Sequence, residues 1–262
     1  MAAPTTKEFA PIHDIELYYE VRGDGEPLVL LHGGGGAGTN WDLIFGDPPA
    51  GFRLIIPDLR GHGRSQNRSG HFTFRQCALD VLALLDHLEI DQFKAIGVSL
   101  GAKTLLHVAT QQPTRVAAMI LVSAAPYFPE QARLVMRAID TETRSEAEWR
   151  QMRQWHQTDD QIRALWQMAR GFADSYDDLN FTPPYLSRIT ARTLIVHGDR
   201  DELYPVRLAV EMYEAIARSQ LWVVPDGGHG PIFGARAEQF RLTAMGFLTA
   251  GESADQPDAR PN

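Results

Sequence analysis

The stretch Gly97–Gly101, with the sequence GVSLG, places a serine between two glycines. The apolar run 93–96 before it predicts a strand, and 102–111 after it predicts a helix. Glycines two residues before and after a serine permit a sharp, strained turn, because side chains there would collide with the neighbouring strand and helix. Such a turn exposes the hydroxyl at the start of a helix, where backbone N–H groups point at a bound substrate. The pattern therefore predicts that Ser99 is a nucleophile.

A serine hydroxyl becomes a strong nucleophile only when a base removes its proton, and the base needs a third group to orient it. His229 lies in the glycine-rich loop 226–230, directly after the last predicted strand, so we expect it to be the base. The other histidines end strands, or lie in turns and on helix surfaces: His13, His32, His62, His71, His87, His107, His156 and His197. We expect these to be surface or structural histidines.

The acid should follow the preceding strand, in the loop 197–205, which offers three carboxylates. Asp201 lies in the middle of this loop, far enough from the strand to reach across to His229, so it is the favoured acid. Asp199 is the alternative, and its other role would be to cap the turn. Glu202 is expected to face solvent.

Short apolar runs alternate with helical patterns along most of the chain, which predicts an α/β protein with a mostly parallel sheet and helices on both faces. Strands are expected at 15–21, 28–31, 52–56, 93–96, 116–122, 193–196 and 221–224, and helices at 72–88, 102–111, 206–217 and 235–248. All three candidate catalytic residues follow strands, so they should meet at the carboxyl edge of the sheet.

No strand pattern appears between residues 126 and 184. Helical spacing and two capping-box patterns, beginning at Ser145 and Thr158, predict inserted helices instead. Because this insertion follows the strand 116–122, we expect a helical cap over the carboxyl edge. The α/β core is thus expected at 1–125 and 185–250, with the polar residues 251–262 as a disordered tail.

The chain has 262 residues, 44% of them hydrophobic and 22% charged, and a net charge of -8. This composition fits one large globular domain, and the negative charge argues against nucleic acid or an anionic membrane as a partner. The one cysteine, Cys77, is expected to be a buried, inert thiol. No stretch approaches a membrane span and no signal peptide is visible, so we expect a cytoplasmic protein. We expect no metal and no cofactor.

The glycines 33–38 match the phosphate-binding pattern G-x-G-x-x-G after a strand, and Asp58 lies where an acid that binds a ribose would lie. Nucleotide binding is therefore one alternative. It is disfavoured because the prolines in 47–49 end the following helix early. A small-molecule receptor on the same scaffold is another alternative, since a fold does not fix a function.

Five motifs occur in the order and strand context of the α/β-hydrolase family, which the sequence resembles from about residue 9 to residue 248. They are His32-Gly33-Gly34, the loop 58–65 ending in Gly-His-Gly-Arg-Ser, the turn 97–101, the loop 198–205 and Gly228-His229. In that family the residue aligned with Asp201 is the acid of a Ser-His-Asp triad. The resemblance also implies an oxyanion hole formed by the backbone N–H groups of Gly34 and Leu100. Losing one such donor typically lowers the rate by a factor of about 100 to 1000.

The resemblance implies a serine hydrolase that cleaves a carboxylic ester through an acyl-enzyme. Relatives that act on halides or epoxides carry aspartate at the turn, so Ser99 argues against both. Enol-lactonase, perhydrolase and carbon–carbon bond hydrolase activities use the same triad and are the alternatives. The carbon–carbon hydrolases usually carry tryptophan after the catalytic histidine, where this chain has Gly230.

The insertion is rich in aromatic and methionine side chains. Those of interest are Trp149, Met152, Trp155, Trp166, Met168, Phe172 and Tyr176. We expect most of them to form the core of the cap, with the remainder as an apolar lid that favours a small hydrophobic ester. Lys103, one turn after Ser99, is expected to form a surface ion pair.

Overall fold

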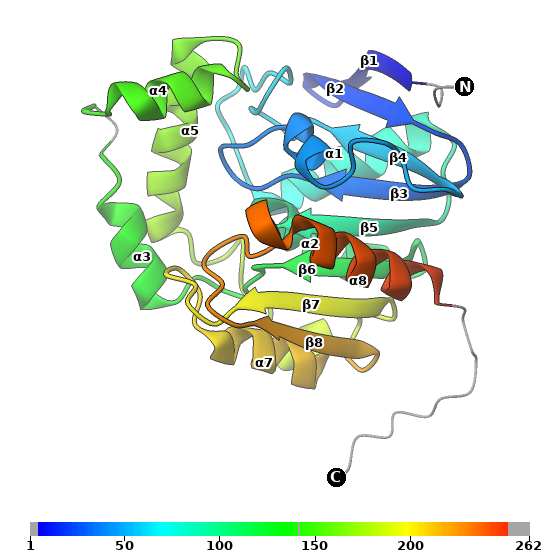
Figure 1. Cartoon of the computed structure of the whole chain (residues 1–262). Coiled ribbons are helices and arrows are strands. Elements are labelled where there is room, and N and C mark those ends of the chain that lie inside the picture. The colour runs from blue at the N-terminus through cyan, green and yellow to red at the C-terminus, as the bar shows by residue number, and fades with distance from the viewer. Residues whose placement is uncertain (1–4, 141, 251–262) are drawn as a thin grey trace.

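The structure is a computed structural model that describes residues 5–140 and 142–250. Within these ranges the chain forms an eight-stranded sheet with the order β1-β2-β4-β3-β5-β6-β7-β8 (Figure 1). The strands are β1 (Thr5–Ile12), β2 (Ile15–Arg22), β3 (Glu26–Leu31), β4 (Phe52–Pro57), β5 (Phe93–Val98), β6 (Val116–Val122), β7 (Arg192–Gly198) and β8 (Ser219–Val224). Strands β3 to β8 run parallel, whereas β2 is antiparallel to β1 and to β4. The predicted α/β fold is confirmed.

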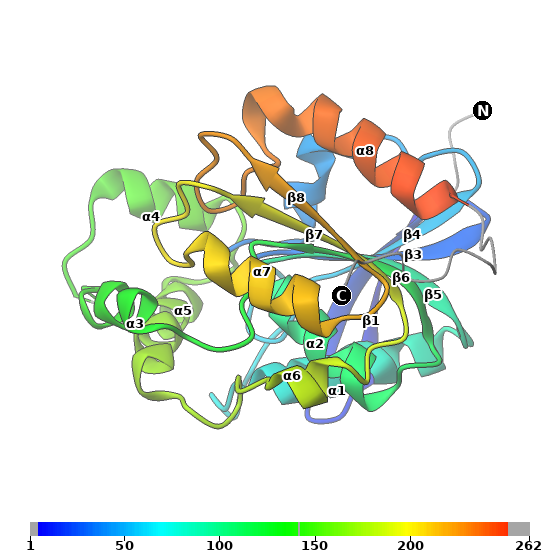
Figure 2. The same ribbon diagram turned by 90° about the horizontal axis from the view of Figure 1, so that it is seen from below.

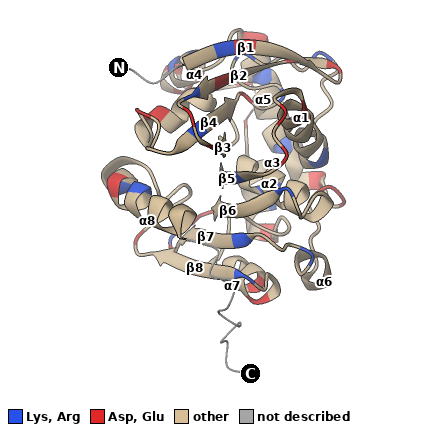
Figure 3. Cartoon of the chain, turned by 90° about the vertical axis from the view of Figure 1, so that its right-hand side faces the viewer, with Lys and Arg blue, Asp and Glu red and all other residues tan. Residues whose placement is uncertain are grey.

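Helices cover both faces of the sheet. They are α1 (Phe74–His87), α2 (Leu100–Gln111), α6 (Pro183–Leu186), α7 (Val206–Ala215) and α8 (Ala237–Thr249), with the short 3-10 helices η1 (Gly38–Leu43) and η3 (Gly234–Arg236). Figure 3 shows α8 on one side of the stacked strands and α1, α2 and α7 on the other. Alternate residues of β3 point to opposite faces of the sheet. Leu28 and Leu30 pack with Trp41 and Phe240 on one face, whereas Val29 and Leu31 belong to the core beneath α1 and α2 on the other.

The segment between β6 and β7 contains further helices, α3 (Glu130–Arg137), α4 (Glu146–Arg153) and α5 (Asp159–Gly171), followed by η2 (Phe172–Asp174). In Figure 2 these helices lie beyond the carboxyl ends of the parallel strands. The capping box at Ser145 forms, because its Oγ accepts from the Glu148 N–H and its N–H donates to the Glu148 carboxylate. At Thr158 only half of the box forms, since Gln161 accepts from Gln157 instead.

Two differences from the predicted elements have physical reasons. Strand β1 was not predicted, because its first five residues are exposed and carry no alternating pattern. Strand β2 extends one residue beyond the predicted 15–21, and most of its residues are buried between its neighbours β1 and β4. Cys77 is buried as predicted, whereas the predicted tail 251–262 lies outside the described residues. No helix in the described part of the chain has the length and apolar character needed to cross a bilayer.

Candidate active site

Ser99 occupies the tight turn between β5 and α2, with φ 48° and ψ −101°. The flanking glycines make this turn possible. A Cβ at Gly97 would lie 2.6 Å from the Gly101 carbonyl carbon, and a Cβ at Gly101 would overlap the Leu31 carbonyl oxygen. The turn is anchored by the Ser99 N–H, which donates to the Val122 carbonyl at 2.8 Å. The strained turn expected from the GVSLG pattern is therefore present.

The structure brings Ser99, His229 and Asp201 together. His229 Nε2 lies 2.8 Å from Ser99 Oγ, and His229 Nδ1 lies 2.9 Å from Asp201 Oδ2. An ionised carboxylate can only accept, so Nδ1 carries the proton and Nε2 is left to accept from the serine hydroxyl. This is the arrangement in which an imidazole acts as a general base toward serine.

Asp201 is held in its ionised form. Burial by itself raises the pKa of this carboxyl, but the hydrogen bond from His229 and the backbone N–H groups of Leu203 and Tyr204 lower it below its ordinary value overall. Its side chain is fully buried, whereas that of His229 is about 20% exposed. Asp199 lies elsewhere: its carboxylate accepts from the Gly227 N–H at 3.2 Å, which is the turn-capping role considered for it.

Two glycines allow the loops that carry Asp201 and His229 to approach each other. A Cβ at Gly198 would overlap the Gly227 carbonyl, and the two loops exchange the hydrogen bond from the Arg200 N–H to that carbonyl. The His229 loop is also fixed from the other side, because Ser123 Oγ accepts from the Gly230 N–H at 3.1 Å. Ser123 was not singled out from the sequence; its position directly after β6 was the only available signal.

Gly34, in the loop after β3, and Leu100, directly after Ser99, border the same cavity as the serine. A Cβ at Gly34 would lie 3.5 Å from Leu100 Cδ1, so the two loops are in close contact. Among the hydrogen bonds of the described residues, none is donated by the Gly34 or Leu100 N–H. Both groups are therefore free to donate to a ligand beside Ser99.

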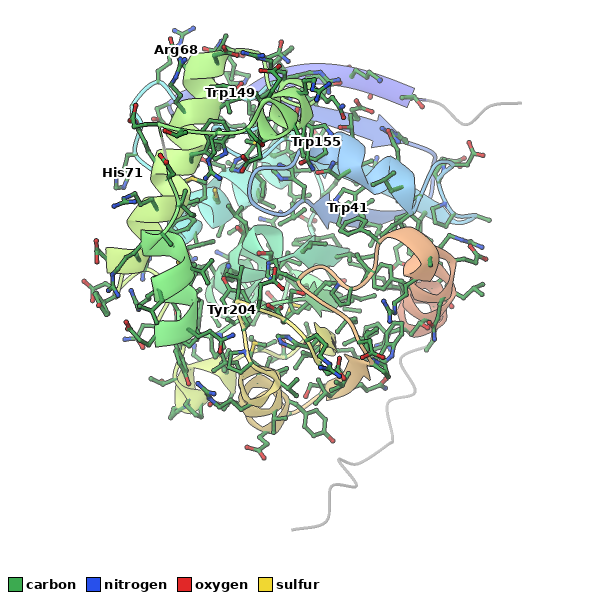
Figure 4. The ribbon with its side chains drawn as sticks, turned by 60° about the vertical axis from the view of Figure 1, so that its left-hand side comes forward. Trp41, Arg68, His71, Trp149, Trp155 and Tyr204 are labelled. Carbon is green, nitrogen blue, oxygen red and sulfur yellow. The ribbon has the colours of Figure 1, made fainter. Side chains whose placement is uncertain are left out.

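Two cavities reach Ser99 and His229. One, of about 490 Å³, opens toward η1 and is lined by Trp41, Leu43, Trp155 and Phe233. The other, of about 420 Å³, lies beneath α3, α4 and α5 and is mostly apolar. Figure 4 shows Trp155 near the inserted helices and Trp41 nearer the sheet. Ser99 thus lies at the junction of the two cavities. A substrate bound there can place one part in each cavity.

Several side chains of the insertion both pack together and line the second cavity. Met152, Trp166 and Met168 belong to a cluster with Ile162 and Leu165, and they also border the cavity, as do Trp155 and Phe172. The expectation that most of them form the core of the cap rather than the cavity lining was wrong. The inserted helices form a single layer, so the same side chains pack against neighbouring helices and face the cavity.

Lys103 was also predicted wrongly. It is 3% exposed and lines the second cavity, and it makes no surface ion pair. Its ammonium group donates to the Tyr204 hydroxyl at 2.6 Å. The apolar helix around Lys103 was the one local sign of this burial, and the residues that cover the side chain come from other elements.

Among the histidines expected in turns or on helix surfaces, His107 is buried, and so are two that lie close together, His62 and His156. Their rings lie 6.1 Å apart, and His62 also contacts His32 at 5.1 Å. His156 accepts from the Gly63 N–H and lies 3.0 Å from the Gly35 carbonyl, so it joins the insertion to two loops of the core. Burial lowers the pKa of the imidazoles of His32, His62 and His156, which keeps them neutral.

The nucleotide-binding alternative fails on two observations. The helix after the glycine-rich loop is a six-residue 3-10 helix, too short for the helix of a dinucleotide turn. Asp58 is 1% exposed, and its carboxylate already accepts from the N–H groups of Gly38 and Arg64. It is thus unable to bind a ribose. Within 5–140 and 142–250, no group of three or more His, Cys, Asp or Glu side chains is arranged to hold a metal.

The geometry agrees with comparisons to known proteins. A family model described as alpha/beta hydrolase fold matches residues 26–161. A 2-hydroxymuconate semialdehyde hydrolase from a Pseudomonas species is 29% identical over 260 residues, covering 88% of this chain and 90% of the relative. A pimeloyl-acyl-carrier-protein methyl ester esterase from Nitrosomonas europaea is 26% identical, covering 86% and 96%. The enol-lactonase from Burkholderia xenovorans LB400 shares the fold, with a TM-score of 0.76 at 23% identity, covering 92% and 99%.

The sheet order, the strained serine turn and the loops at the carboxyl edge define an α/β hydrolase. The match over residues 26–161 shows that the chain belongs to the alpha/beta hydrolase fold family.

Proposed function

We propose that this hydrolase is a serine esterase that cleaves small carboxylic esters through an acyl-enzyme. The observation that carries the proposal is the hydrogen-bonded chain from Ser99 through His229 to Asp201 at the junction of two cavities. An ester has two parts, an acyl group and an alcohol, and each cavity has room for one of them.

In the proposed reaction His229 takes the Ser99 proton while Oγ attacks the ester carbonyl. The N–H groups of Gly34 and Leu100 stabilise the negative charge that develops on the carbonyl oxygen. His229 then gives its proton to the leaving alcohol, and a water activated by the same imidazole releases the acid. Asp201 stays ionised throughout and stabilises the imidazolium.

We further propose that residues 126–184 act as a cap on a core formed by 1–125 and 185–250. The cap would supply the apolar lining of the second cavity, through Met152, Trp155 and Trp166 among others. An apolar lining favours an uncharged, hydrophobic chain next to the scissile bond. Because the two cavities have volumes of about 490 and 420 Å³, we propose a small-molecule substrate.

The first prediction concerns the nucleophile and the base. With 4-nitrophenyl butyrate, Ser99→Ala and His229→Ala should each lower kcat about 10⁴-fold or more, because neither partner acts without the other. Stopped-flow release of 4-nitrophenol should show an acyl-enzyme burst only in the wild type. Ser187→Ala and His71→Ala, at exposed positions, are the matched controls. Full activity in Ser99→Ala would refute the proposal.

The acid is tested by a matched pair of variants. Asp201→Asn should lower kcat by about 10⁴-fold, since an amide favours the wrong imidazole tautomer. Asp199→Asn, two residues away, should change it little. The opposite result would assign the acid to Asp199.

The relatives supply the alternatives. One is named as a hydrolase of 2-hydroxymuconate semialdehyde, a carbon–carbon cleavage, and the fold is shared with an enol-lactonase. Perhydrolase activity and a receptor role are the remaining alternatives. The wild type should hydrolyse 4-nitrophenyl butyrate faster than it hydrolyses an enol-lactone or a ring-cleavage product, and faster than it converts acetate and hydrogen peroxide to peracetate and water. Tight binding of a small molecule without turnover would favour the receptor.

A further inference from the structure

Lys103 is a buried cation beside the proposed nucleophile. It lies on α2, one helical turn after Ser99, and lines the same 420 Å³ cavity. Its ammonium group lies 5.3 Å from the ring centroid of Phe74, 5.1 Å from that of Phe128 and 4.7 Å from that of Tyr204. The hydroxyl of Tyr204 accepts its hydrogen bond at 2.6 Å. Two of its three N–H donors are therefore left for a ligand.

Carboxylates near Lys103 are already engaged. Asp201 is the one whose charge reaches the ammonium group, but its oxygens accept from His229, Leu203 and Tyr204. Within the described residues no carboxylate forms an ion pair with Lys103. A buried ammonium without a counter-ion is costly, and burial accordingly lowers the pKa of Lys103; a carboxylate from outside the chain would supply the missing counter-ion.

We propose that Lys103 and Tyr204 form a subsite for a carboxylate at the far end of the substrate's acyl chain. The proposal rests on the proposed esterase function and narrows it to half-esters of dicarboxylic acids. The scissile carbonyl would lie at Ser99, the methylene groups against the apolar lining, and the terminal carboxylate against the ammonium group and the phenol.

The length and charge of the acyl group follow from the geometry. Lys103 lies on α2 four residues after Ser99, so their backbones lie about 6 Å apart along the helix axis, and the test therefore covers three acyl lengths. A few methylene groups span this distance. One ammonium group balances one negative charge, so a carboxylate fits, whereas a dianionic phosphate would bring a second charge into an apolar cavity. The Tyr204 hydroxyl has its own hydrogen to donate as the second contact.

The charge on Lys103 gives the subsite a pH dependence. Burial lowers the pKa of its ammonium group to about 7, with Asp201 acting weakly in the opposite direction. The other titratable groups that face it are Tyr204, whose pKa burial raises, and His229, whose ring lies 5.4 Å from that of Tyr204. Helix α1 and the segment after β6 place the aromatic rings of Phe74 and Phe128 against it. Above pH 7 the free enzyme loses the cation, and with it the attraction for a carboxylate.

The test uses matched pairs of substrates. The probes are the 4-nitrophenyl monoesters of glutaric, adipic and pimelic acid, each compared with the neutral ester of the same acyl length. The readout is the ratio of the two kcat/KM values, which cancels any general loss of activity. We expect the best monoester to be preferred about 10- to 100-fold at pH 6.5, the effect of one charge-assisted contact. The ratio should fall above pH 7.

Variants test whether Lys103 causes the preference for the monoester. Lys103→Met keeps the length and apolar stem but removes the charge, so it should abolish the preference and its pH dependence. Lys103→Arg should restore part of it, and Tyr204→Phe should reduce it several-fold. Lys7→Met, on the exposed edge strand β1, is the control and should leave the ratio unchanged. An unchanged ratio in Lys103→Met, or a wild type without preference at all three lengths, would overturn the subsite.

A binding experiment separates this proposal from the esterase proposal. The Ser99→Ala variant is titrated with heptanoate and with heptan-1-ol, and the fluorescence of Trp155 and Trp166 in the cavity wall reports binding. We expect heptanoate to bind at least tenfold more tightly, and Lys103→Met in the same background to remove that difference. Equal binding of the acid and the alcohol would refute the subsite even if esters are hydrolysed. A clear difference without ester turnover would refute only the esterase.

Discussion

Ser99 has a backbone conformation, φ 48° and ψ −101°, that residues with a Cβ rarely adopt. Such a conformation costs about 1 kcal/mol or more for any residue except glycine. The surrounding hydrogen bonds, including Lys103 N–H to the Ser99 carbonyl at 3.0 Å, hold the turn in place despite this cost. The strain is thus part of what exposes the hydroxyl.

This strain predicts a stability difference between two inactive variants. Ser99→Gly should be about 1 kcal/mol more stable than Ser99→Ala, because alanine retains the Cβ that opposes the turn. Urea unfolding followed by tryptophan fluorescence measures the difference. If the two variants unfold at the same urea concentration, the turn is unstrained.

At the scale of elements, the site is assembled by loops that follow β5, β7 and β8. The loops after β7 and β8 touch at Gly198 and Gly227, which have no side chain to keep them apart. The parallel register pairs Gly198 with Val224, so both strands end at the same level. This contact sets the distance between Asp201 and His229.

Gly198→Ala should therefore damage catalysis more than it damages the fold. Its Cβ would push the two loops apart, and a displacement of about 1 Å can lower a rate 100-fold. The expected loss of stability is about 1–3 kcal/mol. Ester hydrolysis and urea unfolding measure the two effects. Gly171→Ala, where a Cβ meets nothing within 4 Å, is the control and should be active. Normal kcat in Gly198→Ala would show that the contact is dispensable.

At the scale of the whole molecule, buried histidines connect parts that are distant in sequence. His32 accepts from the Leu59 N–H and His156 from the Gly63 N–H. With the His156 contact to Gly35, they join the glycine-rich loop, the loop after β4 and the inserted helices. Both rings must stay neutral, because a protonated ring nitrogen cannot accept these hydrogen bonds.

This network predicts loss of stability in mild acid. Burial lowers the pKa of His32, His62 and His156, so below pH 6.5 the unfolded chain binds protons that the folded protein does not. Stability then falls as pH falls, by up to about 1.4 kcal/mol per pH unit for each histidine. Urea unfolding at pH 7.5 and 5.5 should show this slope. His156→Gln should reduce it and exposed His71→Gln should not; equal slopes in all three proteins would contradict the prediction.

The fold and the candidate site could be predicted from the sequence wherever the signal lies within a few neighbouring residues. The strand 116–122 was predicted with its observed bounds, and the five motifs each follow a strand as expected. The burial of Lys103 was not predicted, and neither was the position of His156 between the loops of the core, for the same physical reason. Their burial is created by Phe128, Tyr204 and the loop at Gly63, which come from other parts of the chain. Local periodicity contains no information about such partners.

The distance along the chain between Ser99 and His229 also affects how the protein folds. The hydrogen bond between them joins residues 130 positions apart, and His229 follows β8, at one edge of the sheet. A growing chain that ends before β8 contains the proposed nucleophile and acid but lacks the proposed base. Long-range pairs of this kind form late, because closing a large loop is slow. Return of activity during refolding should therefore coincide with the docking of the last strand, and a chain that lacks this strand should be inactive.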